Sequence, residues 1–170
     1  MLQKVHVEQY FDAEKTEAIL FMVVGALAIV AALAVWLALK SQWSIGLCIP
    51  LVALAAVQLA VGWAVYSSSD RQRTDVVYAM DLDPAAIREK EIPRMQKVMR
   101  NFQIYRYTEL ACVMLGAVLV WKCSFNGSLA FWNGIGCGLS AQALILLVLD
   151  FFAEKRGGQY LHSLLEWTQR

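Results

Sequence analysis

Long apolar blocks separated by short polar segments dominate the pattern of this chain. Three blocks, 18–39, 45–66 and 129–149, contain 22, 22 and 21 residues and no charged side chain. A helix needs about 20 apolar residues to cross the hydrocarbon core of a bilayer. Each of these blocks therefore predicts a membrane-spanning helix.

A fourth apolar block is shorter. Residues 110–121 number only 12. A helix of that length measures ~18 Å, well short of the ~30 Å hydrocarbon core. Extending the block back to residue 104 gives 18 residues but includes Arg106 and Glu109. We predict a span over 104–121, because an even number of spans agrees with the charge distribution.

The basic residues are distributed unevenly between the connecting segments. Of the 15 Lys and Arg residues, 13 lie in the N-terminal tail, the linker 67–107 and the C-terminal tail, whereas only Lys40 and Lys122 lie in the other two loops. Short loops rich in Lys and Arg remain in the cytoplasm. This predicts a multi-pass protein of a bacterial inner membrane with both termini and the linker in the cytoplasm. The Asn126-Gly127 dipeptide between the last two blocks favours a tight turn.

The linker predicts two helices. Residues 67–78 continue the second span without Gly or Pro, and Asp83 and Pro84 are a good N-cap and a good first helical residue. Apolar residues then recur with the spacing of one helix face, at Ile87, Met95, Val98, Met99, Phe102 and Tyr105. We predict a helix over 84–106 that continues into the third span, with a kink at Pro93.

The predicted fold is a single domain, 1–170, of the all-α membrane class. It has four transmembrane helices and a cytoplasmic helical hairpin between helices 2 and 3. The first hairpin arm, 67–83, has two basic and four acidic residues, and the second, 84–107, has six basic and two acidic. Antiparallel pairing would place opposite charges side by side. The hairpin is either a self-paired, solvated stalk, since exposed pairs are weak, or a docking surface for a partner.

The two tails carry apolar residues at helical spacing. Gly157-Gly158 predicts a flexible joint, so that the tail 152–170 forms a short amphipathic helix that lies on the membrane or packs on the stalk. The N-terminal segment is likewise predicted either to lie on the membrane or to pack on the stalk. Its apolar residues are Val5, Val7, Tyr10 and Phe11.

One face of the second arm is the candidate contact surface for a partner or for lipid. Arg94, Lys97 and Arg100 recur every third residue and therefore lie on one helix flank, and Met99 and Phe102 add apolar contact area. Each basic group near anionic headgroups gains ~1 kcal/mol. The simpler interpretation is the ordinary excess of basic residues on the cytoplasmic side.

Charged residues also gather at the cytoplasmic ends of the spans. Glu17, Arg106, Glu109 and Asp150 are predicted to form a polar girdle at one depth, with Arg106 and Glu109 within reach of each other at i,i+3. On this interpretation Arg106→Ala costs more stability than Arg94→Ala. The simpler interpretation is a rim of side chains that extend to water.

Two glutamines are the main polar residues inside the spans. Gln58 and Gln142 are expected to form hydrogen bonds between helices. A second interpretation makes them part of a conduction path together with Ser140. Ion and proton pathways usually contain Asp, Glu, His or Lys at depth, and the uncharged spans argue against a proton-coupled transporter. The small residues Gly134, Gly136 and Gly138 predict a close helix contact.

Composition and motifs limit the chemistry. Hydrophobic types make up 59% and charged types 17% of the residues, which excludes a disordered chain and a disulfide-rich secreted scaffold. The two histidines lie in the tails, and no CxxC, Walker or HExxH motif occurs. We therefore expect no catalytic residue, no cofactor, no metal site and no nucleic-acid partner.

The preferred function is protein–protein binding in or under the membrane by a non-enzymatic polytopic protein. This class includes subunits of membrane assemblies and immunity proteins that neutralise membrane-acting toxins. Membrane lipid, a protein partner and further copies of the chain are the expected partners. The alternative is an oligomeric channel or transporter subunit. A membrane enzyme would require Glu17, Glu109 and Arg106 to surround a pocket.

Overall fold

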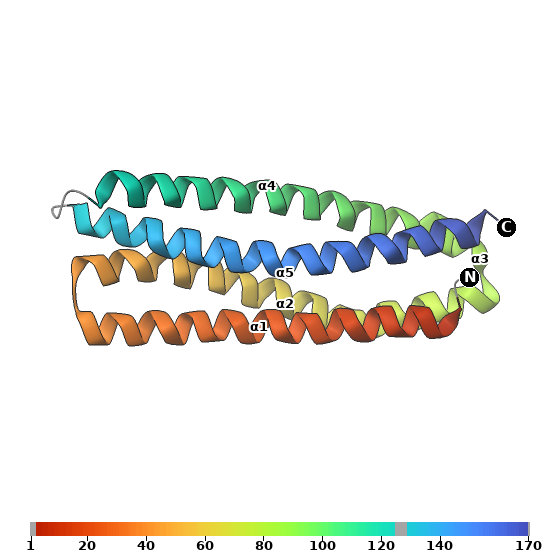
Figure 1. Ribbon diagram of the computed structural model, residues 1–170. Helices are drawn as coiled ribbons and strands as arrows, with labels where there is room; N and C mark the ends of the chain where they lie inside the picture. Colours follow the sequence, from red (N-terminus) through yellow and green to blue (C-terminus); the bar gives the residue numbers. More distant parts are fainter. Residues whose placement is uncertain (1–2, 125–128, 170) are drawn as a thin grey trace.

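Four long helices run side by side along most of the molecule (Figure 1). The structure, a computed structural model, describes residues 3–124 and 129–169, and the predicted turn at Asn126-Gly127 lies outside these ranges. The long helices are α1 (Lys4–Leu39), α2 (Gln42–Leu82), α4 (Ile92–Cys123) and α5 (Ala130–Thr168), with α3 (Pro84–Ala86) and the π-helical turn η1 (Ile87–Glu91) between α2 and α4.

All four long helical stretches are apolar enough to cross a membrane, and the one that ends at Cys123 is the least apolar. The predicted all-α bundle with four candidate membrane spans is therefore confirmed. Each helix is also longer than a membrane requires. α2 has 41 residues, which correspond to ~60 Å, about twice the hydrocarbon core. Roughly half of the bundle therefore extends beyond the apolar zone.

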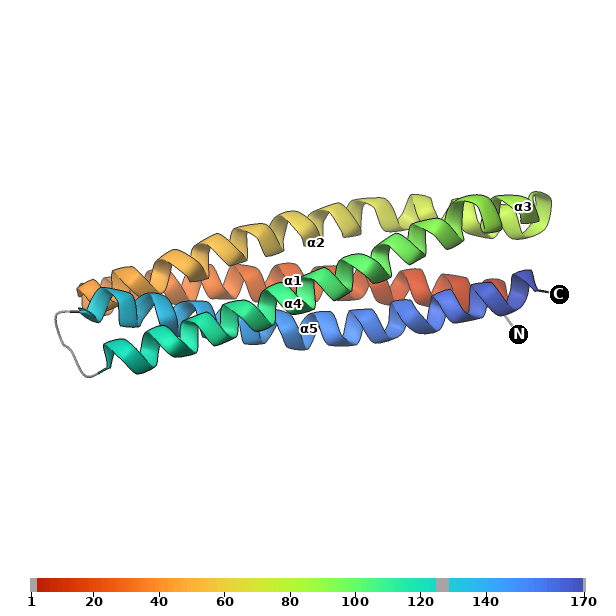
Figure 2. The same cartoon turned by 90° about the horizontal axis from the view of Figure 1, so that it is seen from above.

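This extension is called the head, and consists of residues 4–17, 67–106 and 150–168. It contains both described chain ends and the α2–α4 connection, which lie together at one end of the molecule (Figure 1). The remainder, residues 18–66, 107–123 and 130–149, is called the apolar segment. Seen from above, α4 lies beside α5 at the end of the bundle opposite the head, and it meets α2 at the far end of the head (Figure 2).

The connection between α2 and α4 forms as the sequence predicts. The Asp83 carboxylate accepts a hydrogen bond from the Ala86 amide at 3.4 Å, and Pro84 is the first helical residue. The backbone then stays helical through α3, η1 and α4, so the prediction of a helix continuous with the third span is confirmed. The π-helical turn ends two residues before Pro93. A proline lacks the donor for a helical hydrogen bond, which agrees with an irregular turn at this place.

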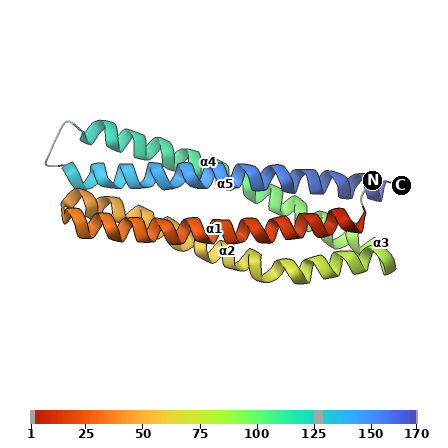
Figure 3. The same cartoon turned by 60° about the horizontal axis from the view of Figure 1, so that its bottom comes forward.

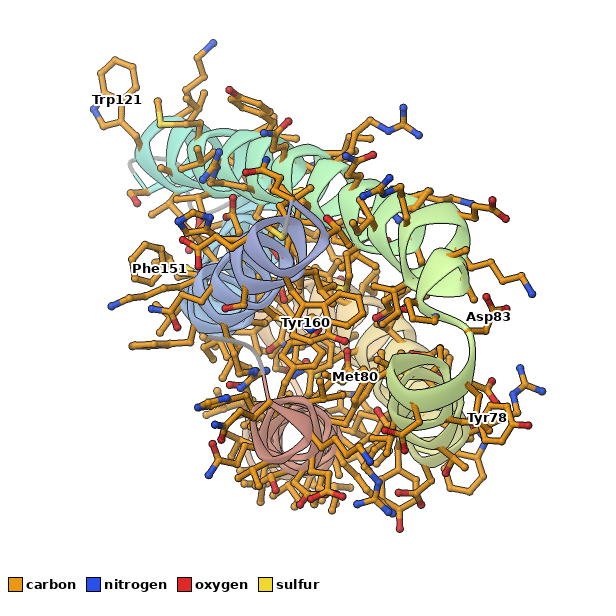
Figure 4. The ribbon with its side chains drawn as sticks, turned by 90° about the vertical axis from the view of Figure 1, so that its right-hand side faces the viewer. Tyr78, Met80, Asp83, Trp121, Phe151 and Tyr160 are labelled. Carbon is orange, nitrogen blue, oxygen red and sulfur yellow. The ribbon has the colours of Figure 1, made fainter. Side chains whose placement is uncertain are left out.

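No separate hairpin projects from the bundle, and this part of the prediction is wrong. The start of α1 and the end of α5 run the full length of the head and cover the apolar face that the hairpin would otherwise expose. Phe11 of α1, Met95 of α4 and Leu164 of α5 are among the largest fully buried side chains. Seen along the bundle from the head, Tyr160 and Met80 point into the space between the helices (Figure 4). Both tails therefore pack on the rest of the head.

The predicted flexible joint at Gly157-Gly158 is also wrong. α5 passes through both residues without interruption. Gly157 lies so close to α4 that a Cβ there would be 3.3 Å from Met99 Sδ. Close packing against α4 favours the helix and offsets the helix-weakening effect of two glycines.

The acidic first arm pairs with α1 rather than with the basic second arm. Lys15 contacts Asp70 at 2.5 Å, and Arg73 contacts Asp12 at 2.8 Å. At the end of the head, Lys4 contacts Asp81 at 2.6 Å. Because α1 occupies the side of α2 that carries these charges, the charge pairing predicted within the hairpin does not form there.

In the apolar segment, α2 and α5 pack at the centre through glycines, and α1 and α4 pack on their outer sides. A methyl group at Gly46 would overlap the carbonyl oxygen of Phe131, and one at Gly134 would overlap that of Trp43. Gly136 approaches α4, where a Cβ would lie 2.7 Å from the carbonyl oxygen of Gly116. The predicted close contact of the fourth span is confirmed. Figure 3 shows that α2 crosses α1, and α4 crosses α5, along the bundle.

Candidate functional site

A buried ion pair forms the centre of a polar network in the head. Glu91, at the end of η1, is only 7% exposed. It accepts hydrogen bonds from Nε and Nη2 of Arg94, both at 2.7 Å, and one from the hydroxyl of Tyr160 at 3.1 Å. Arg94 also donates to Gln72 of α2 at 2.9 Å. One carboxylate therefore connects the start of α4 to α5 and, through Arg94, to α2.

A second carboxylate extends this network to α1. Glu14 accepts hydrogen bonds from the hydroxyls of Tyr10 at 3.1 Å and Ser69 at 2.7 Å. The rings of Tyr10 and Tyr160 stack with centroids 3.9 Å apart. Burial and then the nearby carboxylates raise the pKa of both phenols above their usual value. Both tyrosines therefore stay neutral donors at physiological pH, and the network is suited to holding four helices together rather than to proton transfer.

The five predicted contact residues do not share one exposed face. Arg94 belongs to the buried network, and Met99 and Phe102 are half-buried close to Gly157 of α5. Lys97 and Arg100 are exposed on α4. These two basic side chains remain available to an external contact.

Sequence reasoning missed the residues that complete the network. Tyr10 and Glu14 are four residues apart on α1, and Glu91 and Arg94 are three apart. Both spacings indicate local pairs on a helix. They do not reveal that the two pairs meet, because that depends on how the tails pack.

The four girdle residues take part in three different pairs. Arg106 contacts Glu154 at 3.1 Å. Glu17 pairs with Arg156, which donates to both of its carboxylate oxygens. The expected pair of Arg106 with Glu109 does not form. α5 packs against both α1 and α4. Its Glu154 therefore pairs with Arg106 of α4, and its Arg156 pairs with Glu17 of α1.

The third pair consists of two acids. Glu109 of α4 is 8% exposed. Glu109 lies one turn along α4 from Arg106, and Asp150 lies one turn along α5 from Glu154, so the Arg106–Glu154 ion pair places the two acids opposite each other. Neither side chain has an ion-pair partner in the described part of the chain. The Oε2 atom of Glu109 is buried without any hydrogen bond there.

The two glutamines in the apolar segment bind each other. Gln142 donates to Gln58 at 2.8 Å, and Gln58 donates to the carbonyl oxygen of Phe21 at 2.9 Å. The chain therefore links α5, α2 and α1 by hydrogen bonds at depth. Ser140 donates instead to the carbonyl oxygen of Val113 on α4. Ser140 therefore bonds to α4, whereas the two glutamines bond to each other.

An open groove lies on the head between α1 and α2. It has a volume of about 570 Å³. Its lining consists of charged, apolar and aromatic side chains, namely Glu8, Asp12, Arg73, Thr74, Val77, Tyr78 and Asp81. Tyr78 projects outward from α2 (Figure 4) and is 64% exposed.

Within residues 3–124 and 129–169, no group of three or more His, Cys, Asp or Glu side chains is arranged to hold a metal ion. No protein-family model matches the chain, and neither a curated protein nor a solved structure shows significant similarity to it.

Proposed function

We propose that this protein is a non-enzymatic, multi-pass protein of a bacterial inner membrane that binds a protein partner through its head. It acts as a subunit of a membrane assembly or as an immunity protein against a membrane-acting toxin. The head and both termini face the cytoplasm, in agreement with the 13 basic residues on that side and two on the other.

The observation that carries this proposal is the groove between α1 and α2 on the head. Apolar side chains exposed in the apolar segment face lipid, but Tyr78 and Leu82 lie beyond it and are 64% and 67% exposed. Exposed tyrosine next to a concave surface is typical of protein contact sites. A head of this length is also more than four membrane spans need to be stable in a bilayer.

The lining of the groove favours a basic segment of the partner. It contains three acidic side chains and one basic one, and Arg73 is already bound to Asp12. Glu8 has no ion-pair partner in the described part of the chain. A Lys- or Arg-bearing helix or strand would find both charge complementarity and an aromatic contact there. Lys97 and Arg100, on α4, are then the residues proposed to contact anionic headgroups.

The test is a photo-crosslinking amino acid at position 78 of the full-length protein in native membranes. A matched control carries the same amino acid at position 82, which is equally exposed on the same helix but does not line the groove. We expect a protein crosslink at 78 and at most a weak one at 82. The double variant Glu8→Lys/Asp81→Lys, with a crosslinker at 78, should lose about tenfold or more of this product, because two like charges then oppose a basic segment.

Two results contradict the proposal. One is equal crosslinking from positions 78 and 82. The other is an unchanged product when the two acids are replaced. Thermal unfolding in detergent shows whether the double variant remains folded.

Orientation is tested separately with one cysteine at position 90 in a chain that lacks its four native cysteines. An impermeant thiol reagent should label this cysteine only after the membrane is permeabilised. Rapid labelling of intact cells would place the head outside the cytoplasm and contradict this part of the proposal.

The alternative, an oligomeric channel or transporter subunit, has less support. The glutamines bind each other and Phe21, so a conducting path would have to form between copies. Light scattering of the purified protein in detergent gives the number of copies, and ion flux into vesicles that contain it tests conduction directly.

A further inference from the structure

We infer that Glu109 and Asp150 form a proton-binding site, in which one proton is shared between two carboxyl groups where the apolar segment meets the head. The ligand is the proton itself. Nothing in this inference depends on what binds the head.

The first support is the burial of Glu109 without a partner. Its side chain is 8% exposed, and Oε2 has no hydrogen bond in the described part of the chain. A buried carboxylate without a donor is costly, and such a group usually takes up a proton instead. Asp150 lies opposite Glu109, one turn along from the Arg106–Glu154 ion pair, so a proton shared by the two carboxyl groups would supply the missing bond.

The second support is that the neighbouring cations are already engaged. Arg106, one turn from Glu109 on α4, is bound to Glu154 of α5, and Arg156 of α5 is bound to Glu17 of α1. On α2, Asp70 is the first charged residue beyond the apolar block, and it is bound by Lys15. Glu154 lies one turn from Asp150 on α5 and adds a negative charge beside it. Two adjacent carboxylates in such surroundings do not both ionise easily.

The position of the pair gives the proton a route. Asp150 is half-buried at the head side, whereas Glu109 is buried against α5. A proton reaches the site through Asp150 from the aqueous side. Loss of the proton would leave two negative charges facing each other across the α4–α5 contact and would weaken it.

The test uses dicyclohexylcarbodiimide, an apolar reagent that reacts with protonated carboxylic acids. The acid O–H adds across one C=N bond, the proton going to nitrogen and the carboxyl oxygen to the central carbon. The adduct then rearranges to a stable N-acylurea that peptide mass analysis locates. Glu91 is the internal control, because it is as buried as Glu109 but is bound to Arg94.

We expect Glu109 to be labelled at pH 7, the rate to fall as the pH rises, and Glu91 to remain unlabelled. Asp150→Asn should lower the rate at Glu109 about tenfold or more, because the variant removes the neighbouring negative charge that favours the protonated form. Equal labelling in wild type and Asp150→Asn would show that burial alone protonates Glu109 and would overturn the shared site.

A second measurement does not depend on the reagent reaching the site. Infrared spectra of the folded wild type at pH 7 should contain the carbonyl stretch of a protonated acid. This band should disappear in both Glu109→Gln and Asp150→Asn. Absence of the band from the wild type overturns the proposal. Protection from labelling by sodium chloride but not by choline chloride, at constant pH, would assign the site to a metal cation and overturn it as well.

Discussion

The head and the apolar segment use the same four helices but bury side chains of different size. Large apolar side chains fill the head, and small residues fill the apolar segment. In the head, Phe11, Ile87 and Met95 are at most 1% exposed. In the apolar segment, glycine and alanine occupy the interior, whereas Leu27 and Met114 are 61% and 65% exposed. Trp121 of the apolar segment likewise points away from the bundle (Figure 4).

This difference shows which force holds each part together. Water surrounds the head in the proposed arrangement, so removal of apolar area from water stabilises it by about 25 cal/mol per Å². Lipid surrounds the apolar segment, and burying a leucine there gains little, because lipid tails are as apolar as the protein interior. Close backbone approach and hydrogen bonds between helices then supply the stability.

The largest effect should come from Phe11→Ala in the head. Loss of a fully buried phenylalanine removes its apolar contacts and leaves a cavity, which costs ~3–5 kcal/mol. Leu27→Ala in the apolar segment should change the free energy of unfolding by less than ~0.5 kcal/mol, because its side chain is exposed to lipid. Thermal and denaturant unfolding in one detergent measures both. Similar losses for the two variants would remove the distinction between the two parts.

Two glycine substitutions should show the opposite order, with the larger loss of stability in the apolar segment and the smaller in the head. Gly134→Ala should cost ~2–3 kcal/mol, because its methyl group overlaps the backbone of α2 at Trp43 and the helices must move apart. Gly157→Ala in the head meets side chains rather than backbone, with the flexible Met99 at 3.3 Å and Met95 and Phe102 at ordinary van der Waals distance. It should be neutral or stabilising by up to ~1 kcal/mol through helix propensity. A larger loss at Gly157 than at Gly134 would contradict the assignment of close backbone packing to the apolar segment.

The third test compares two arginines at different depths of the head. Arg94→Ala should cost ~2–3 kcal/mol, because it leaves the buried Glu91 without its counter-charge. Arg106→Ala should cost less than ~1 kcal/mol, because Arg106 is 40% exposed in its pair with Glu154. Adding Glu91→Gln to Arg94→Ala should recover part of the loss, since a neutral amide needs no counter-charge. Unfolding in detergent at low and high salt measures all three variants.

The ranking of these arginines shows where sequence reasoning fails. The pattern places Arg106 next to Glu109 on one helix, so the sequence ranks Arg106 as the more important side chain. In the structure both residues find other partners, on α5. Helical periodicity identifies neighbours on one helix, but the rotation of α5 against α4 decides which charges meet.

Other features follow from local rules and were predictable. The Asp83-Pro84 helix start depends only on adjacent residues, and the spans depend on composition within one block. The tails did not follow from local rules. Gly157-Gly158 is a helix-weakening pair on its own, but α5 is continuous there and packs closely against Met99 of α4. Packing of that kind depends on residues that are distant in the sequence.

The smallest expected effect is a dependence of stability on pH, which the head should show through a charged pair and the apolar segment should not show. The hydrogen bond from Lys15 lowers the pKa of Asp70 in the folded protein, and the same contact raises the pKa of Lys15. Because the folded pKa of Asp70 lies below its unfolded value, the pair adds stability above that unfolded value and loses it as the pH falls through the folded pKa. On the alkaline side, the contribution is lost as the pH rises through the raised pKa of Lys15.

Asp70→Asn should therefore be slightly less stable than wild type at pH 7 and equally stable at pH values below the folded pKa of Asp70. The effect is small because Asp70 is 57% exposed and salt screens the pair. Gln142→Met in the apolar segment is the matched control. Its cost should not vary with pH, because the glutamine pair has no titrating group. Unfolding midpoints of the three proteins across an acid series measure this, and a pH-independent cost for Asp70→Asn would mean that the Lys15 contact contributes nothing to stability.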